Sequence, residues 1–301
     1  MGVSMSLSIR TDWNASISPY VPFATYYTEE IVDPKTRKTR EVGLKHMRGY
    51  DIAKNGGKGY TKKDQIACAQ DVIDEVLYKN GKETPFFTRV KNEIKKYPDT
   101  IIIAPSLQTD APHNVLPITF AHILAEETDC KVDQSIYQKP KDKSKRQMDG
   151  LERLAKDTEF YGAVKPGQTY YIVDDVMTMG GTVAAMKSYI ESKGGKVVGI
   201  AVLADGTKEL HRRADINVGI PLAPTQATME KLEQTFKDTN RLHNIFKGST
   251  GHGHKELTER EAAFVQSKYH GDFIKLRNGL LGATNTGHPQ GSPAAPKGLS
   301  S

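Results

Sequence analysis

Short apolar runs alternate with helical patterns in the middle of this 301-residue chain, and this alternation constrains the fold more than any other feature. The runs Thr100–Ala104, Tyr170–Asp174 and Val197–Ala204 have the composition of strands that are buried on both faces of a sheet. Leu116–Glu127 and Val183–Lys193 carry apolar residues at helical spacing between them. Strands separated by helices indicate parallel pairing through crossover connections. We therefore expect an α/β fold, with a doubly wound and mainly parallel sheet and flanking helical additions.

The pattern also suggests how the chain is divided. We expect an N-terminal flanking or hood region, a core, a C-terminal helical addition and a disordered tail, at residues 1–99, 100–222, 223–281 and 282–301. The first region contains two amphipathic helices, and the addition contains a long or broken helix followed by one that a capping box opens at Thr258. Ten of the twenty tail residues are Gly, Pro or Ser, a composition that cannot build a core.

Composition restricts the compartment more than the function. The longest near-continuous apolar run, Val197–Ala204, is much shorter than the roughly 18 residues of a membrane-spanning helix. Two cysteines form no disulfide framework, and the first residues lack the apolar segment of a secretion signal. We expect a cytoplasmic protein. The net charge is +6, from 42 basic and 36 acidic residues, and it suits phosphorylated ligands or nucleic acid without choosing between them.

Two acidic residues, Asp174 and Asp175, stand where the second apolar run ends. In open parallel sheets, ligands bind beyond the carboxyl ends of the strands, so we expect both carboxylates to project into a binding crevice. Carboxylates in such a position can accept hydrogen bonds from neighbouring hydroxyl groups, such as those of a ribose. A pair of acids in a solvated turn is the alternative interpretation.

A turn rich in glycine and threonine follows the acids. Gly180 and Gly181 allow the backbone to approach a ligand closely, and the helix that follows them begins with amides that attract an anion. Thr178 and Thr182 add hydroxyl groups. A sugar-diol site next to an anion site describes a ribose 5-phosphate.

The segment Tyr170–Thr182 resembles the phosphoribosyl pyrophosphate (PRPP) binding signature of type I phosphoribosyltransferases, and the strand and helix order suits that family. The segment departs from the signature at Tyr171 and Met179. The resemblance implies Mg²⁺ as cofactor and PRPP as co-substrate. It implies that Asp174 and Asp175 act at the ribose hydroxyls and the metal. It places the 5-phosphate on Thr178, Met179, Gly180, Gly181 and Thr182.

Two loops complete the expected site by analogy with the family. A loop after the first core strand would bind pyrophosphate, and here it contains Ser106, Leu107, Gln108 and Thr109 but no lysine or arginine. A mobile loop between the second and third core strands would close over the site. The segment 139–146 lies in that interval with five basic residues and one acidic residue, and a solvated surface is an equally good interpretation of it. The passage from Arg146 to Arg153 also resembles the ComF-like branch, although the Arg-Gly-Phe-Asn element of that branch is missing.

The resemblance implies transfer of ribose 5-phosphate from PRPP to a nitrogen acceptor with release of pyrophosphate, a step of nucleotide metabolism. Two alternatives stay open: a non-catalytic PRPP-sensing regulator that binds nucleic acid, and a degenerate transferase scaffold for protein partners. PRPP is the expected partner and no membrane is expected, while a homodimer stays open and nucleic acid is the less favoured further partner. His252 and His254 lie in a glycine-rich stretch, which we expect to be a surface loop rather than a metal site.

Overall fold

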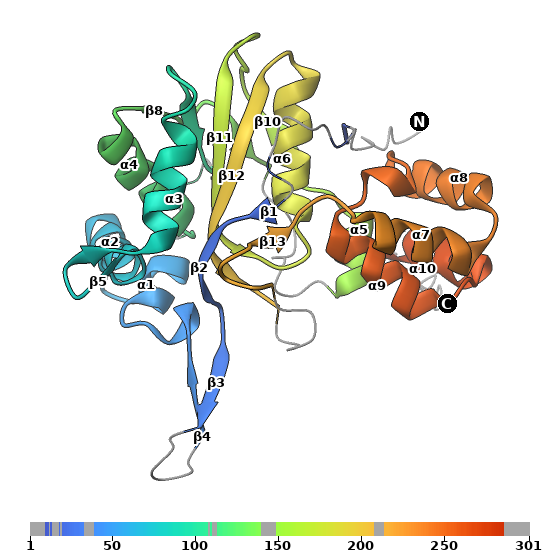
Figure 1. Cartoon of the computed structure of the whole chain (residues 1–301), viewed down its shortest axis with the longest axis horizontal. Coiled ribbons are helices and arrows are strands. Elements are labelled where there is room, and N and C mark those ends of the chain that lie inside the picture. Colours follow the sequence, from blue (N-terminus) through green and yellow to red (C-terminus); the bar gives the residue numbers. More distant parts are fainter. Residues whose placement is uncertain are drawn as a thin grey trace, which may run out of the picture.

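The computed structural model describes residues 10–11, 13, 18, 20–32, 39–107, 109, 113–139, 149–207 and 214–285. A five-stranded sheet lies at its centre, with the strand order β2-β12-β11-β7-β8 (Figure 1). Its strands are β2 (Phe23–Tyr26), β7 (Ile101–Ile103), β8 (Lys131–Asp133), β11 (Thr169–Met177) and β12 (Lys196–Asp205). Every neighbouring pair in this sheet is parallel, which confirms the expected α/β fold.

Helices cover both faces of the sheet. The helices α2 (Lys62–Leu77), α3 (Pro85–Ile94) and α4 (Leu116–Thr128) lie on one face, and α6 (Gly181–Ser192) lies on the other (Figure 1). Side chains alternate along a strand, so Tyr171 and Val173 of β11 pack in the first core while Tyr170 and Ile172 pack in the second. Burial on both faces explains why these strands are apolar without interruption.

The N-terminal region contributes more than flanking helices. Its strand β2 pairs in parallel with β12 and forms one edge of the sheet. The short helix α1 (Tyr50–Asn55) follows a hairpin of β3 (Glu29–Val32) and β4 (Thr39–Val42) that projects from the molecule, and the single turn η1 (Leu44–His46). Four residues next to Pro22 are too short a pattern to identify β2 from the sequence.

Four two-stranded sheets contain the remaining strands and β3–β4. They pair β1 (Tyr20–Val21) with β13 (Ile220–Pro221), β5 (Tyr78–Lys79) with β6 (Lys82–Glu83), and β9 (Tyr137–Gln138) with β10 (Phe160–Tyr161). The neighbouring strands β8 and β9 thus belong to different sheets.

A separate helical bundle packs beside the sheet. It contains α5 (Gly150–Ala155), α7 (Gln226–Phe236), α8 (Thr239–Thr250), α9 (Glu259–Tyr269) and α10 (Phe273–Asn285). Their buried side chains, among them Leu154 of α5 and Leu280 of α10, form a third core. The long or broken helix of the expectation is two helices, and Lys237 between them has a left-handed φ of 60°. The last helix ends at Asn285, so the expected tail begins inside it, and residues 286–301 lie outside the described part of the chain.

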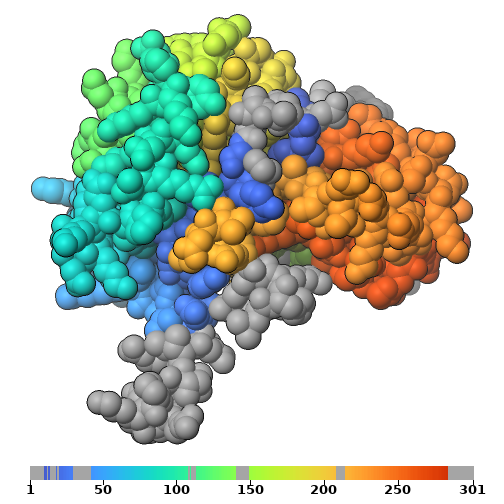
Figure 2. Space-filling view, in the orientation of Figure 1, coloured from blue at the N-terminus to red at the C-terminus, as the bar shows by residue number. Residues whose placement is uncertain are grey.

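The bundle and the helices α2–α4 occupy opposite sides of the molecule, and the N-terminal segment around β2 runs between them (Figure 2). Within the described ranges, no helix combines the length and the apolar character that crossing a membrane requires.

Candidate functional site

The strand β11 extends beyond its neighbour β7 at the carboxyl end of the sheet. Its last residue paired with β7 is Ile172, opposite Ile103, whereas its pairing with β12 continues as far as Met177. Asp174 and Asp175 therefore lie past the end of β7, at the rim of the sheet. Ligands of open parallel sheets bind at this rim.

Both acidic side chains at this rim are buried rather than solvated. Asp174 is 9% exposed and Asp175 is 3% exposed, so the solvated-turn interpretation is wrong. The amide of Asp175 donates to Oδ1 of Asp174 at 2.8 Å. Burial, together with the neighbouring charge of Asp175, raises the pKa of Asp174 to about 8. The raised pKa favours the protonated form of Asp174.

Asp175 has a cationic partner that the sequence analysis missed. Nζ of Lys54, on α1, forms an ion pair with Oδ2 of Asp175. Other contacts hold this end of α1 against the loop that precedes α4: Nε2 of Gln65 donates to the carbonyls of Ala53, at 3.2 Å, and His113, at 2.7 Å. A helix of six residues has too little periodicity to reveal which of its side chains faces a site.

The expected pyrophosphate loop follows β7 and contacts β9. The amide of Gln138 donates to the carbonyl of Ser106 at 2.7 Å, and Leu107 forms an isolated parallel β-bridge with Gln138. Thr109 is described, whereas Gln108 lies outside the described residues. Of the basic segment 139–146, the structure describes Lys139, whose Nζ is 3.2 Å from Oε2 of Glu159 on the protein surface.

The glycine-rich turn leads directly from β11 into α6. Gly180 is the N-cap of α6 and has a left-handed φ of 85°, a conformation that favours glycine. Gly181 is the first helical residue, and Thr182 follows in the same turn. On α5, Nη1 of Arg153 donates to the hydroxyl of Thr178 at 3.3 Å, which brings a second cation close to the turn. The helix start, the glycines and the nearby guanidinium favour an anion at this position.

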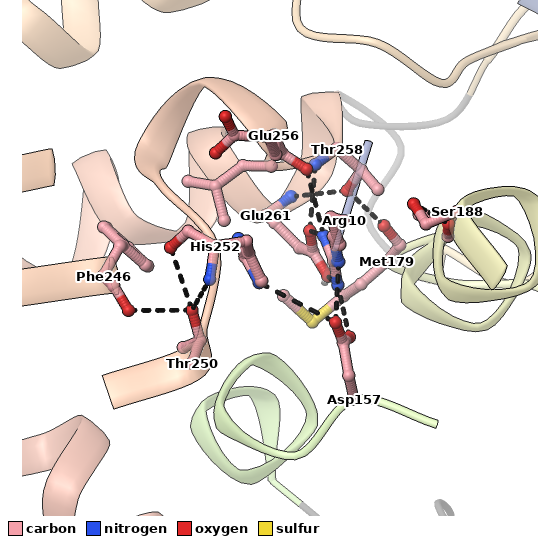
Figure 3. Close-up of polar contacts among 12 residues, drawn as sticks. Arg10, Asp157, Met179, Ser188, Phe246, Thr250, His252, Glu256, Thr258 and Glu261 are labelled. Carbon is pink, nitrogen blue, oxygen red and sulfur yellow. Dashed lines mark hydrogen bonds and ion pairs between the residues drawn. The ribbon is translucent and has the colours of Figure 1, made fainter. Parts of the chain in front are cut away.

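A buried ion cluster joins this turn to the bundle (Figure 3). The guanidinium of Arg10 contacts both Asp157, at 2.8 Å through Nε, and Glu261, at 2.9 Å through Nη2. A Cβ atom on Gly181 would lie 2.9 Å from Oε1 of Glu261 and 3.3 Å from Nη2 of Arg10. Gly181 is therefore required for the close approach of α6 and α9.

The glycine-rich stretch with two histidines lies in the same junction, so the expectation of a surface loop there is wrong. His252 is 1% exposed, with Nε2 3.8 Å from Oδ2 of Asp157. Burial and the charge of Arg10 lower the pKa of His252. His254 is 2% exposed and its Nε2 is 3.3 Å from Oε1 of Glu233. Across the described residues, no three His, Cys, Asp or Glu side chains are grouped to hold a metal ion.

Comparison with known proteins agrees with the resemblance of Tyr170–Thr182. The family described as "Phosphoribosyl transferase domain" matches residues 118–225. Protein TraN of Escherichia coli is 32% identical over 179 residues, which are 58% of this chain and 36% of that protein. An adenine phosphoribosyltransferase of Leuconostoc citreum is 46% identical over 54 residues, covering 18% of this chain and 30% of that enzyme.

Among solved structures, an adenine phosphoribosyltransferase of Rhodothermus marinus is similar at 21% identity with a TM-score of 0.28, covering 46% of this chain and 78% of that one. The chain spans about a third of the length of the curated relatives it matches. The matched range contains β8, β11, α6 and β12, and with them the acidic pair and the glycine-rich turn. Residues 118–225 of this chain thus match the phosphoribosyl transferase domain family.

Proposed function

We propose that this protein binds PRPP and transfers its ribose 5-phosphate to a nitrogen acceptor, releasing pyrophosphate. One observation carries this proposal: a buried carboxyl pair, Asp174 and Asp175, lies at the rim of a parallel sheet immediately before a glycine-rich turn that opens α6. A sugar diol and a terminal phosphate need these two kinds of group side by side.

The acidic pair would hold the ribose. Asp174 would offer its carboxyl oxygens to one hydroxyl of the ribose, and in its protonated form, which burial favours, it can also donate a hydrogen bond. Asp175 would accept from the second hydroxyl. The pair also suits Mg²⁺, which prefers oxygen ligands and keeps several from water or substrate phosphates, and which would neutralise charge on the leaving group.

The turn Thr178–Thr182 would hold the 5-phosphate through backbone amides and threonine hydroxyls. Arg153 adds a positive charge there, since its guanidinium contacts the hydroxyl of Thr178. Met179 occupies a position where the family signature has a small residue, and its backbone amide stays available whatever its side chain is.

The pyrophosphate would lie between the loop Ser106–Thr109 and Lys54. This loop has no basic side chain, so the negative charge of the leaving group requires a cation from another element. Lys54 can supply this cation. Gln65 links the end of α1 to His113, in the chain that follows the loop, and the ammonium group of Lys54 contacts Asp175. When the substrate binds, Lys54 would contact the pyrophosphate and Asp175 the ribose hydroxyl, and the ion pair between the two side chains would weaken.

In the reaction, the bond between C1 of the ribose and the pyrophosphate oxygen breaks, and its electron pair leaves with the pyrophosphate. The acceptor nitrogen then forms the new bond to C1, and a proton leaves that nitrogen. The protein would contribute by holding both ends of PRPP, stabilising the leaving charge and excluding water that would otherwise take the sugar.

Thermal unfolding with and without Mg²⁺–PRPP tests the binding step. We expect PRPP to raise Tm in the parent protein and in Asp71→Asn, an exposed acid on α2, but not in a double variant with Asp174→Asn and Asp175→Asn. Pyrophosphate release with a panel of nucleobases and small amines then tests transfer, starting with adenine because of the similarity to adenine phosphoribosyltransferases.

The two assays separate the alternatives. PRPP binding without turnover on any acceptor, combined with PRPP-dependent binding to nucleic acid, would favour a sensing regulator. The absence of any PRPP effect on Tm would reject both PRPP-based functions and leave a scaffold for protein partners.

A further inference from the structure

Three successive carbonyl groups at the end of β11 are held by the helical bundle. On α9, Nη1 of Arg260 donates to the carbonyls of Met177, at 3.2 Å, and Thr178, at 2.8 Å. The carbonyl of Met177 also accepts from the amide of Gly206, just beyond β12, at 2.9 Å. The hydroxyl of Thr258 donates to the carbonyl of Met179 at 2.5 Å (Figure 3). The contacts of the bundle come from a segment more than 70 residues away in the sequence, and two side chains make all three.

The direction of these carbonyls determines where the following amides point. Every described peptide bond is trans, and in a planar trans peptide the N–H points opposite to the C=O. The amides of Thr178, Met179 and Gly180 therefore point away from the bundle. Gly180 then turns the chain into the first turn of α6, whose own amides have no partners within the helix. The carbonyls thus face α9, and the amides of these peptides face the opposite side.

Arg260 and Thr258 are themselves held in place by further contacts. Nη2 of Arg260 donates to Oδ2 of Asp205 at 2.8 Å, and Asp205 is fully buried at the end of β12. Thr258 is the N-cap of α9, and its side chain accepts from the amide of Glu261. Glu261 is paired with Arg10. Both donors therefore hold the turn from fixed positions, one set by the sheet and the other by the buried cluster.

This arrangement differs from ordinary packing between the sheet and the helical bundle. A packing contact would bury apolar side chains, whereas here charged and hydroxyl donors meet backbone oxygens of the turn that precedes α6. If the carbonyls of Thr178 and Met179 lost these partners, their peptide planes could rotate and the amides would no longer converge, whereas the carbonyl of Met177 would keep its bond from Gly206.

We propose that Arg260 and Thr258 are positioning residues of the phosphate site, so that the C-terminal bundle sets the affinity of the domain for the 5-phosphate of its sugar ligand. The inference rests on the proposed function, in which the turn Thr178–Thr182 binds that phosphate. It gives Arg260 and Thr258 a role in the site although neither side chain needs to touch the ligand.

The test compares two probes that use different parts of the site. Ribose 5-phosphate requires the turn, whereas Mg²⁺–pyrophosphate requires the loop at Ser106–Thr109 and Lys54. We expect Arg260→Met to weaken binding of ribose 5-phosphate and of PRPP at least tenfold by calorimetry, and to leave the affinity for Mg²⁺–pyrophosphate within about twofold of the parent. Arg260→Lys should recover part of the loss, because it keeps the charge and one donor.

Arg277→Met is the matched control, since Arg277 is an exposed arginine on α10 of the same bundle. It should bind all three probes as the parent does. Thr258→Val is the second test variant, and it should show the same selective loss if Arg260→Met does not fold.

Equal affinity of parent, Arg260→Met and Thr258→Val for ribose 5-phosphate would overturn the inference, and so would an equal loss for both probes, which indicates general damage. If the parent binds PRPP in either case, the proposed function survives. If the parent binds none of the probes, both the function and the inference fail.

Discussion

The ammonium group of Lys54 on α1 pairs with the carboxylate of Asp175 on β11. The side chain of Lys54 is 22% exposed and that of Asp175 is 5% exposed, so the pair lies at the boundary between the interior and the solvent. A ligand can therefore reach the ammonium group without unfolding α1, and the cation lies at the rim where the sheet places its acidic pair.

Replacing Lys54 tests its role toward the leaving group. We expect Lys54→Met to weaken binding of PRPP and of Mg²⁺–pyrophosphate about tenfold, since a charge-assisted hydrogen bond contributes about 1.5–3 kcal/mol. Ribose 5-phosphate, which has no pyrophosphate, should bind as before. Isothermal titration of the three ligands measures the difference. Lys58→Met removes an exposed lysine just beyond α1 and should change nothing. Equal weakening for all three ligands would contradict a specific role.

Gly181 provides a prediction about the contact between α6 and α9. We expect Gly181→Ala to destabilise the protein by about 1–3 kcal/mol, because the new methyl group would overlap Oε1 of Glu261, which Arg10 holds in place. Chemical denaturation measures this loss. Gly282→Ala is the matched substitution: Gly282 lies in α10 with no atom within 4 Å of its hypothetical Cβ, so alanine there should raise stability by about 0.5–1 kcal/mol. A destabilised Gly282→Ala would show that helix propensity does not govern this position.

Replacing Arg10 should destabilise the buried ion cluster of Arg10, Asp157 and Glu261. Arg10, Asp157 and Glu261 have side chains that are 1%, 4% and 1% exposed, so Arg10→Met leaves two buried carboxylates without their cation. Such a loss costs about 3–5 kcal/mol. Denaturant titration measures it, and adding Asp157→Asn and Glu261→Gln should recover part of the stability. Lys139→Met breaks a pair on the surface and should leave the midpoint unchanged. A loss of stability as small for Arg10→Met as for Lys139→Met would contradict a stabilising role of the buried ion cluster.

His252 should make the protein sensitive to acid. Its pKa is lowered in the folded state by burial and by Arg10, against the opposing charges of Asp157 and Glu261. The unfolded chain therefore takes up the proton first, and stability is lost as the pH falls from about 6.5 toward the lower folded pKa. We expect the advantage of the parent over His252→Leu in Tm to shrink between pH 7.5 and pH 5. His122→Leu, at an exposed position on α4, should follow the parent at every pH. A constant difference between parent and His252→Leu would contradict the prediction.

Sequence patterns predicted the elements that are buried on both faces. The strands β7, β11 and β12 have continuous apolar runs, and α2, α3, α4 and α6 have apolar residues at helical spacing, so each pattern is long enough to identify its element. The acidic pair and the glycine-rich turn were found for a related reason, because both lie within about ten residues of one such strand.

The rest of the site depends on contacts between distant segments. Lys54, Arg260 and Thr258 come from outside the signature and reach it through helix packing, which no local pattern encodes. The burial of His252 follows from the same packing, since a glycine-rich stretch looks solvent-exposed when the surface that covers it is unknown. Sequence reasoning therefore located the glycine-rich turn but not the residues of other elements that contact it.

The helix α5 belongs to the chain between β9 and β10, yet its Leu154 and Ala155 are buried in the core of the bundle. Cutting the polypeptide after β13 would strip α5 of its apolar covering and expose it to water. The central sheet with its helices and the helical bundle should therefore unfold in a single cooperative transition. Neither should fold as a separate fragment.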